Sequence, residues 1–267
     1  MMGGISPRRI GAFSLRYLYL YKRSFPRLLE IFYWPIMSLL LWGFITVYLA
    51  RFRGALPDFV AFLIGALILW DILFRSQQGV AVSFLEDLWS RNLINIFVSP
   101  LGPAEYVLTL LLISFIKLVM TTTLLVILAW IFYSFDIFTI GFSLIPFIAN
   151  LIVMGWSVGI MTTAVILRYG REAEVLAWGV AFFFQPISAV FYPVEVLPGW
   201  LQNVAWALPS AHVFEGMRAV ITTGVAPVEH LVWAGGLNVV YTVAAALFFS
   251  RNFRIIKEKG LLAKAGD

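Results

Sequence analysis

Residues 182–221 read FFFQPISAVFYPVEVLPGWLQNVAWALPSAHVFEGMRAVI. This stretch begins like a membrane helix and is then broken at Pro193, Pro198 and Pro209. Proline removes a backbone donor and clashes with the preceding turn, so each break predicts a helix start or a kink. The apolar pieces between the breaks are shorter than the about 20 residues that a membrane-spanning helix needs. Because lipid excludes broken backbone unless protein or water covers it, we predict an outer re-entrant helical hairpin over residues 192–221.

The composition of the chain is that of a membrane protein. Of the 267 residues, 61% are hydrophobic and 12% are charged, with a mean hydropathy of +0.92. Soluble domains carry about 25% charged residues, so we predict an all-α polytopic membrane protein. The absence of cysteine excludes disulfides, thiolate metal sites and cysteine nucleophiles. The net charge of +5 flanks the apolar stretches and forms no groove-sized patch, so we expect no nucleic-acid partner.

Six apolar stretches are predicted to cross the bilayer as helices. Their approximate limits are residues 31–49, 59–74, 104–130, 138–167, 175–191 and 230–249. The second helix is expected to continue beyond the membrane surface, because polar residues follow its apolar part. In the fourth helix, Gly155 and Gly159 have the G-x-x-x-G spacing that favours close helix contact.

The distribution of cations predicts the orientation. Lys and Arg gather in the N-terminal region, in segments 75–103 and 168–174, and in the tail. The opposite side carries Arg51, Arg53 and Arg218. Since Lys and Arg mark the cytoplasmic side, both termini are predicted to be cytoplasmic and the broken segment 192–229 to lie outside.

Residues 1–30 alternate cations with aromatic and aliphatic side chains. The cations are Arg8, Arg9, Arg16, Lys22, Arg23 and Arg27. This pattern predicts an amphipathic helix in the cytoplasmic interface, in contact with membrane lipids and ended by Pro26. The alternative is a disordered basic leader, in which the aromatic residues would have no role.

A second informative stretch, SFLEDLWSRNLINIFVSPLGP, covers residues 83–103. Its apolar residues fall near one helical stripe, and Ser99-Pro100 would end the helix. We therefore predict a short amphipathic helix over residues 84–98, on the cytoplasmic side between the second and third spans.

The sequence offers no constellation for catalysis. It contains no nucleotide-binding motif and no serine hydrolase elbow. His212 with Glu215 would leave most of a metal coordination shell unfilled, so no metal site is expected. Asp71 and Glu105 are expected near the membrane interface, and Lys117 is expected to be structural. So few ionisable groups in the spans argue against an ion-coupled pump.

Two segments together resemble the type-2 permeases of ATP-binding cassette (ABC) transporters. Residues 186–221 look like the family's C-terminal hallmark, with breaks at Leu197-Pro198 and Leu208-Pro209 before a short helix that ends at an arginine. Residues 86–107, EDLWSRNLINIFVSPLGPAEYV, are similar to the family's coupling helix, which ends in Ser-Pro. The resemblance covers the chain as a single transmembrane domain, 1–267.

The resemblance implies the permease subunit of a bacterial inner-membrane exporter. The permease would be a dimer, expected to be a homodimer, with a separate cytoplasmic ABC ATPase subunit on each copy. ATP and Mg²⁺ would bind the ATPase, so this chain is expected to hold no cofactor and to be no enzyme. The substrate would be hydrophobic or amphipathic: a drug, a lipid or a glycan-linked molecule.

The resemblance also implies roles for particular residues. ATPase coupling would involve Glu86, Asp87, Trp89 and Arg91. The outer gate would be formed by Pro193, Pro198, Trp200, Pro209, Glu215 and Arg218. The path would lie at the dimer interface, lined mainly by spans one, two and five, with Phe184, Phe191 and Tyr192 as candidate lining residues.

Structural alternatives remain open for these roles. The charges at 86–91 would also suit a solvated loop, and Glu215 with Arg218 would suit a simple i,i+3 ion pair. Phe184, Phe191 and Tyr192 would also suit a role in packing. Trp34 and Trp200 would also suit anchoring at the membrane interface. For the whole chain, the alternatives are an ATPase-independent transporter or channel with an outer re-entrant filter, and a membrane scaffold.

Overall fold

The computed structural model describes residues 5–53, 57–225 and 227–258, and every regular element in these ranges is helical. The α-helices are α1 (Pro7–Lys22), α2 (Phe25–Arg53), α3 (Pro57–Trp89), α4 (Leu93–Val98), α5 (Pro103–Tyr133), α6 (Leu144–Tyr169), α7 (Leu176–Ile187), α8 (Gly199–Trp206), α9 (Pro209–Thr223) and α10 (Val228–Glu258). Short 3₁₀ segments are η1 (Ile137–Ser143), η2 (Gly170–Ala173) and η3 (Val194–Val196). The all-α prediction is confirmed.

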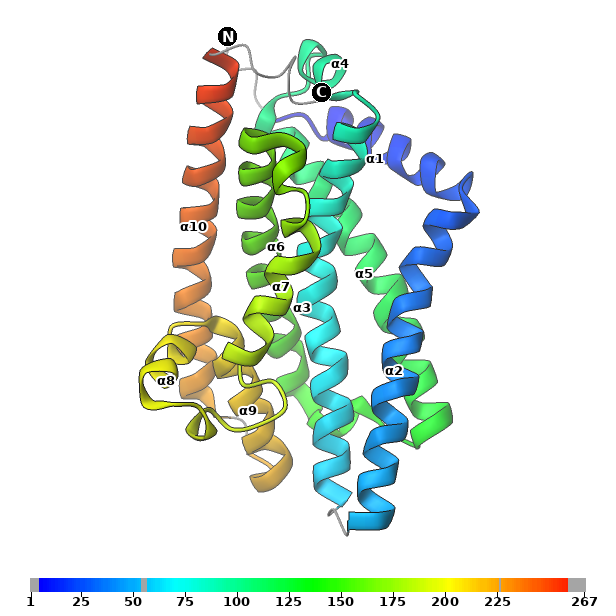
Figure 1. Cartoon of the computed structure of the whole chain (residues 1–267), viewed down its shortest axis with the longest axis vertical. Coiled ribbons are helices and arrows are strands. Elements are labelled where there is room, and N and C mark those ends of the chain that lie inside the picture. Colours follow the sequence, from blue (N-terminus) through cyan, green and yellow to red (C-terminus); the bar gives the residue numbers. More distant parts are fainter. Residues whose placement is uncertain (1–4, 54–56, 226, 259–267) are drawn as a thin grey trace.

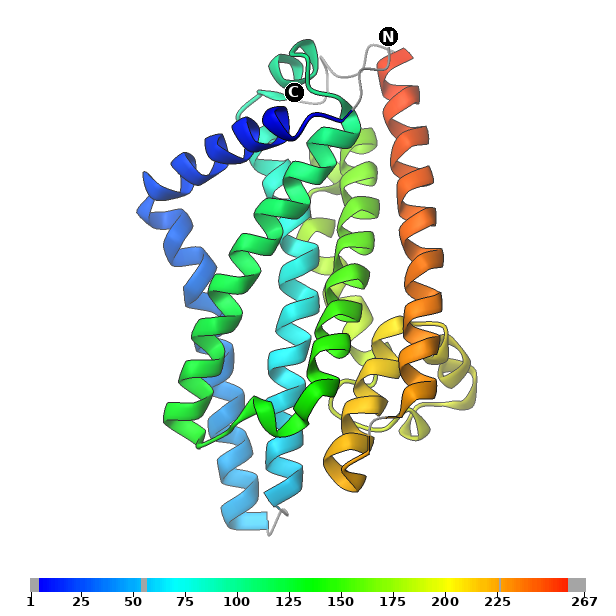
Figure 2. The same ribbon diagram turned by 180° about the vertical axis from the view of Figure 1, so that it is seen from behind.

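The long helices run side by side along one axis of the molecule (Figure 1). The central helix, α3, contacts α2, α5, α6 and α7, while α10 packs on α6 and α9. Figures 1 and 2 show α1 lying across one end of the bundle, at the same end as α4 and the C-terminal end of α10. The short helices α8 and α9 lie towards the opposite end. The molecule therefore has two chemically different ends, one built on α1 and α4 and one on α8 and α9.

Four helices among the described residues are long and apolar enough to cross a membrane. They cover Phe25–Leu49, Pro103–Tyr133, Gly141–Ala173 and Val228–Glu258. Six spans were predicted, and the two that are not among these four helices correspond to α3 and α7. At about 1.5 Å per residue, the 12 residues of α7 are too short to cross about 30 Å of hydrocarbon. The predicted fifth span, 175–191, is thus a short helix that ends at Ile187 and continues as irregular chain.

The N-terminal helix is confirmed within residues 1–30. It starts with Pro7 at its first turn and ends at Lys22. Pro26 lies in the first turn of α2, where a missing backbone donor costs no intrahelical hydrogen bond, so the predicted break falls directly before it. Tyr17 and Tyr21 are buried on the inner face of α1, as the amphipathic pattern requires.

Close contact between α3 and α6 depends on the predicted glycine pair. A Cβ atom at Gly155 would lie 2.6 Å from the carbonyl oxygen of Leu73, and one at Gly159 would lie 2.8 Å from that of Gln77. Both distances are shorter than any tolerated contact, so only glycine lets the two backbones approach this closely. The prediction from the G-x-x-x-G spacing is confirmed.

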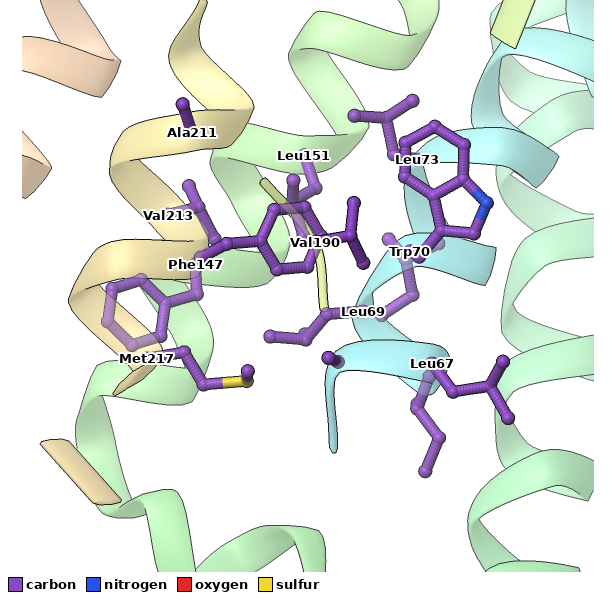
Figure 3. Packing of buried hydrophobic residues seen from close by; sticks show 14 of the residues in the cluster. Leu67, Leu69, Trp70, Leu73, Phe147, Leu151, Val190, Ala211, Val213 and Met217 are labelled. Atoms are coloured by element: carbon purple, nitrogen blue, oxygen red, sulfur yellow. The ribbon is translucent and has the colours of Figure 1, made fainter. Parts of the chain in front are cut away.

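A hydrophobic core joins α3, α6 and α9 in the half of the bundle near α8. Figure 3 shows Trp70 and Leu73 of α3 facing Leu151 of α6, with Val213 and Met217 of α9 on the other side. A second core, around Tyr17, Phe84 and Tyr106, lies under α1. The two cores fix the ends of α3 independently, so α3 is anchored along its whole length.

Candidate functional site

The end of α3 and α4 form the surface that was predicted as one amphipathic helix over 84–98. That prediction is wrong in one respect, because α3 continues to Trp89 and a turn separates it from α4. Arg91 stands in this turn with φ of 53°, a left-handed conformation that no helix continues through. The Ser-Pro end is confirmed, since α4 stops at Val98.

Asp87 faces the interior of the bundle. It is 1% exposed, and its carboxylate accepts hydrogen bonds from the hydroxyls of Tyr17 and Tyr106 and from the Arg16 guanidinium at 2.9 Å. Burial and the neighbouring Asp87 carboxylate raise the pKa of Tyr17, so its hydroxyl stays protonated and keeps donating. A solvated loop is therefore not the environment of Asp87, which ties α1 and α5 to the end of α3.

Glu86 forms a second tie to α1. Its Oε1 accepts a hydrogen bond from the Tyr21 hydroxyl at 2.9 Å and lies 3.9 Å from Nε of Arg27. Lys117 of α5 donates to the same tyrosine hydroxyl, and to Ser83 Oγ at 3.0 Å. These contacts give Lys117 the structural role that its position predicted, as a link between α1, α3 and α5.

Glu105 closes the same end of the bundle. In the first turn of α5, it accepts hydrogen bonds from the backbone N–H groups of Gly102 and Ser6, at 2.8 and 2.7 Å. Its Oε1 also lies 2.6 Å from Nη2 of Arg9. Glu105 thus caps α5 and holds the start of α1, which agrees with the predicted place near a helix end.

Trp89 and Arg91 remain on the surface. Trp89 is 44% exposed, and Arg91 is exposed as well. The indole N–H of Trp89 donates to Glu174 Oε2 at 2.8 Å, and its ring stacks on Trp178 of α7 with centroids 6.1 Å apart. Ile94 and Val98 of α4 are also exposed, so an apolar surface with a cation beside it covers this end.

The opposite end contains the predicted gate segment. Pro193, Pro198 and Pro209 stand at the starts of η3, α8 and α9, where the sequence predicted breaks. The broken segment predicted over 192–229 contains η3, α8 and α9. Trp200 is 71% exposed, on the outer face of α8.

Glu215 and Arg218 form the predicted ion pair, with 2.7 Å between Oε2 and Nη1. Glu215 Oε1 also accepts the backbone N–H of Val194 at 2.7 Å. Arg218 donates to the Ala189 carbonyl and lies over the ring of Phe62, 4.6 Å from its centroid. The pair therefore holds the segment before α8 against α9 and α3.

Two histidines meet at this end, although neither neighbours the other in the sequence. Nδ1 of His212 lies 3.2 Å from Nδ1 of His230, and Nε2 of His212 lies 3.0 Å from the Trp206 carbonyl. Burial lowers the pKa of His212. Glu215 pairs with Arg218 instead, and no group of three or more metal-ligating side chains occurs in the described ranges.

A cavity of about 580 Å³ lies between α2, α3 and α7. Six aromatic residues line it: Trp34, Trp42, Trp70, Phe74, Trp178 and Phe182. Its polar lining includes Asp71, Arg75 and Gln185. The cavity has the size and the mixed apolar lining of small-molecule sites, which measure about 300–1,000 Å³.

Asp71, which was expected near the membrane interface, lies in the middle of α3. Its Oδ1 lies 3.3 Å from Nε of Arg75, and Arg75 also donates to Gln78 at 2.8 Å. Asp71 Oδ2 is buried and has no hydrogen-bond partner among the described residues. The wall of the cavity thus carries an ion pair with one unused acceptor.

The aromatic residues predicted for a path lie beside the cavity rather than in it. Phe184, Phe191 and Tyr192 pack against the core, which supports their alternative role in packing. Phe191 also stacks on Trp42, with centroids 5.6 Å apart, so it supports the cavity wall from behind. Their neighbours Phe182 and Gln185 are the residues that line the space.

A sequence model of the family described as "ABC-2 family transporter protein" matches residues 44–249. The match covers more than half of the chain and includes α3, α4, α7 and the broken segment. The chain belongs to the ABC-2 transporter family. No curated protein matches it.

Membership makes this chain an ABC-2 permease, a multi-pass membrane protein that serves as a transport subunit. Membrane subunits of the ABC-2 family generally work with an ATPase subunit and generally lack a nucleotide site of their own. Family membership thus agrees with the absence of a nucleotide-binding motif from the sequence.

Sequence reasoning missed two features of this ABC-2 permease. The cavity combines Trp70 and Trp178 with Trp34, and nothing in the local pattern distinguishes these tryptophans from interfacial anchors. The His212–His230 pair was missed as well, because 18 residues separate the two histidines. The density of tryptophan, 10 in 267 residues, was the available signal for an aromatic site.

Proposed function

We propose that this permease is the membrane subunit of an exporter, which moves a hydrophobic or amphipathic substrate outward with ATP hydrolysed by a separate subunit. One observation carries the proposal. Trp89, exposed beside α4, stacks on Trp178, and Trp178 lines the cavity between α2, α3 and α7. A force applied to the exposed surface therefore reaches the cavity wall through one aromatic contact.

The coupling surface is Trp89, Arg91 and the exposed residues of α4. An ABC ATPase docked there would displace the end of α3, which runs through the centre of the bundle. Glu86 and Asp87 act through α1, because both are held by residues of that helix and neither is free to contact a partner. ATP and Mg²⁺ would bind the ATPase, and this chain would contribute only the surface on which the ATPase docks.

The proposed topology has six crossings and both termini in the cytoplasm of a bacterial cell, in its inner membrane. The crossings would be α2, α3, α5, α6, α10 and α7 together with the segment that follows it. The end with α1 and α4 would face the cytoplasm, since α1 carries the N-terminal cations. The end with α8 and α9 would face outward as a re-entrant hairpin, held closed by Glu215 and Arg218.

A homodimer would complete the cavity. The apolar side chains of Trp34, Leu41 and Phe182 are more than half exposed, on α2 and α7 beside the cavity. A second permease copy packed on this face would cover them and close the open side. The transport path would then run between the two copies, as the family resemblance implies.

Affinity purification of the tagged full-length chain from its native membranes tests the proposal. We expect an ABC ATPase, identified by mass spectrometry, to co-purify in a one-to-one ratio. Trp89→Ala and Arg91→Gln should each reduce its recovery at least fivefold. Trp130→Ala is the control, because Trp130 is also an exposed tryptophan, at 66%, but lies near the far end of α5. Undiminished recovery with both variants would refute the coupling surface.

Cysteine labelling tests the topology independently, since the chain contains no cysteine. Ser90→Cys and Asn203→Cys place single thiols at exposed positions beside α4 and in α8. An impermeant maleimide added to intact cells should label Asn203→Cys and leave Ser90→Cys unlabelled until the membrane is opened. Labelling of both from the outside would overturn the proposed orientation.

A further inference from the structure

The charges and ring faces of the α2–α3–α7 cavity point to a class of ligand. Four of its aromatic lining residues are tryptophans, the side chain whose ring face attracts cations most strongly. The ionisable groups of the lining are Glu30, Asp71 and Arg75. Two carboxylates and one guanidinium therefore line the cavity, and Glu30 also borders the adjoining space that Arg27 and Lys117 line.

The hydrogen-bonding groups of the cavity favour the same sign of charge. Nε of Arg75 donates to Asp71 and Nη1 donates to Gln78, and the guanidinium lies over the ring of Phe74, 5.3 Å from the centroid. The positive charge of Arg75 is therefore already paired with Asp71 within the protein. The unused polar atom is an acceptor, Asp71 Oδ2, which is buried without a partner in the described part of the chain. A buried acceptor without a partner is costly, and a cationic donor would satisfy it.

We propose that the cavity binds organic cations with an aromatic or apolar body. This inference rests on the proposed function, because it names the substrate class of the proposed exporter. The tryptophan faces would hold the body and part of the charge, and Asp71 would accept the cationic group. Glu30, which is exposed at the cavity, would attract the cation electrostatically.

An anionic lipid or a glycan phosphate is the competing ligand. Such a ligand needs a guanidinium or an ammonium group with free donors, and Arg75 is the only cation in the described lining of this cavity. Arg75 already donates hydrogen bonds to Asp71 and Gln78, which leaves it less able to bind an anionic ligand. The two carboxylates would in addition repel a negative charge in a largely apolar space, where electrostatic interactions are strengthened.

Binding of two matched dyes to the purified full-length chain in detergent micelles tests the proposal. Rhodamine 6G is a cation, whereas rhodamine B has nearly the same ring system and carries a carboxylate that makes it a zwitterion at neutral pH. We expect fluorescence anisotropy to show saturable binding of rhodamine 6G, with an affinity at least tenfold higher than for rhodamine B. Equal affinities for the two dyes would overturn the proposal.

Variants assign the selectivity to named residues. Asp71→Asn should weaken rhodamine 6G at least tenfold and rhodamine B by less, and a wild-type melting temperature would show that the variant is folded. Glu30→Gln, at an exposed position, should weaken rhodamine 6G two- to threefold. Trp34→Ala should weaken both dyes, whereas Trp130→Ala, outside the cavity, should weaken neither.

The proposal fails if neither carboxylate variant reduces the affinity for rhodamine 6G. This outcome is separable from failure of the proposed function, because dye binding needs no ATPase. If the ATPase co-purifies but the dyes are not distinguished, the ligand class is wrong and the exporter proposal stands. If the dyes are distinguished but no ATPase binds, the cavity is a cation site in a transporter or channel of another kind.

Discussion

Replacing Asp87 by Asn should detach α1 from the end of α3. The carboxylate accepts hydrogen bonds from Tyr17 and Tyr106, and both donors are buried. A hydrogen bond to a charged group contributes about 1.5–3 kcal/mol and a neutral one about 0.5–1.5 kcal/mol. Loss of the charge thus costs about 1 kcal/mol for each tyrosine, or about 2 kcal/mol in all. The bond from Arg16 adds little, because that side chain is 31% exposed and solvent screens it.

Trypsin can measure this detachment. Lys22 and Arg23 are exposed at the junction between α1 and α2, and cleavage there requires local opening of the helix end. When opening is fast, the cleavage rate follows the open population. A loss of about 2 kcal/mol corresponds to an about thirtyfold larger open population, because 1.4 kcal/mol is a factor of ten. We therefore expect cleavage of Asp87→Asn at this junction to be about thirtyfold faster than in the wild-type chain.

Two further variants make the measurement specific. Tyr17→Phe should have a free-energy effect of similar size, about 1.5–3 kcal/mol, since it removes one whole hydrogen bond to the charged carboxylate. Glu172→Gln removes an exposed carboxylate from η2 and should leave the cleavage rate unchanged. The reasoning would be refuted if Asp87→Asn were cleaved at the wild-type rate, or if Glu172→Gln were cleaved as fast as Asp87→Asn.

Three other perturbations have expected outcomes. Gly155→Ala should lower the melting temperature of the purified chain, because the added Cβ would lie 2.6 Å from a backbone oxygen. Gly235→Ala on α10 is the control, and since open space surrounds Gly235, the melting temperature should rise or stay the same. Equal shifts for the two variants would contradict the close contact. Arg218→Met should speed hydrogen exchange in residues 194–206 several-fold, because it removes the ion pair with Glu215 and the hydrogen bond to Ala189. Unchanged exchange would show that the ion pair does not hold this segment in place. Burial lowers the pKa of His212. Folding stability should therefore fall as the pH drops below about 6.5, where the unfolded histidine gains its proton. Melting temperatures measured from pH 7.5 to 5 should show this fall, and His212→Gln should make the melting temperature depend less on pH.

The positions of the helix breaks could be predicted because they depend on local chemistry. Pro193, Pro198 and Pro209 each lack a backbone donor, so a helix starts or stops beside them in any surroundings. The same holds for Pro26 at the start of α2. The spacing of Gly155 and Gly159 predicted a close helix contact, but the partner helix, α3, followed only from the packing of the bundle.

The direction in which the charged residues point could not be predicted. Asp87 and Arg91 are four residues apart, and both were predicted to take part in one ATPase-coupling surface. The helix ends between them, and Asp87 turns inward because Tyr17 and Tyr106 supply donors from two other helices. A buried carboxylate is stable only with such partners, and one of them comes from a residue 70 positions away.

Local sequence patterns establish that this chain is a helical membrane protein, with an amphipathic N-terminal helix and a proline-broken segment near its C-terminal end. Hydrophobic runs and prolines fix such features, because they act on their own few residues. No local pattern shows that Trp34, Trp70 and Trp178 share a cavity with Asp71, or that Trp89 touches its wall. These residues come from different parts of helices α2, α3 and α7, and only the packing of those helices brings them together.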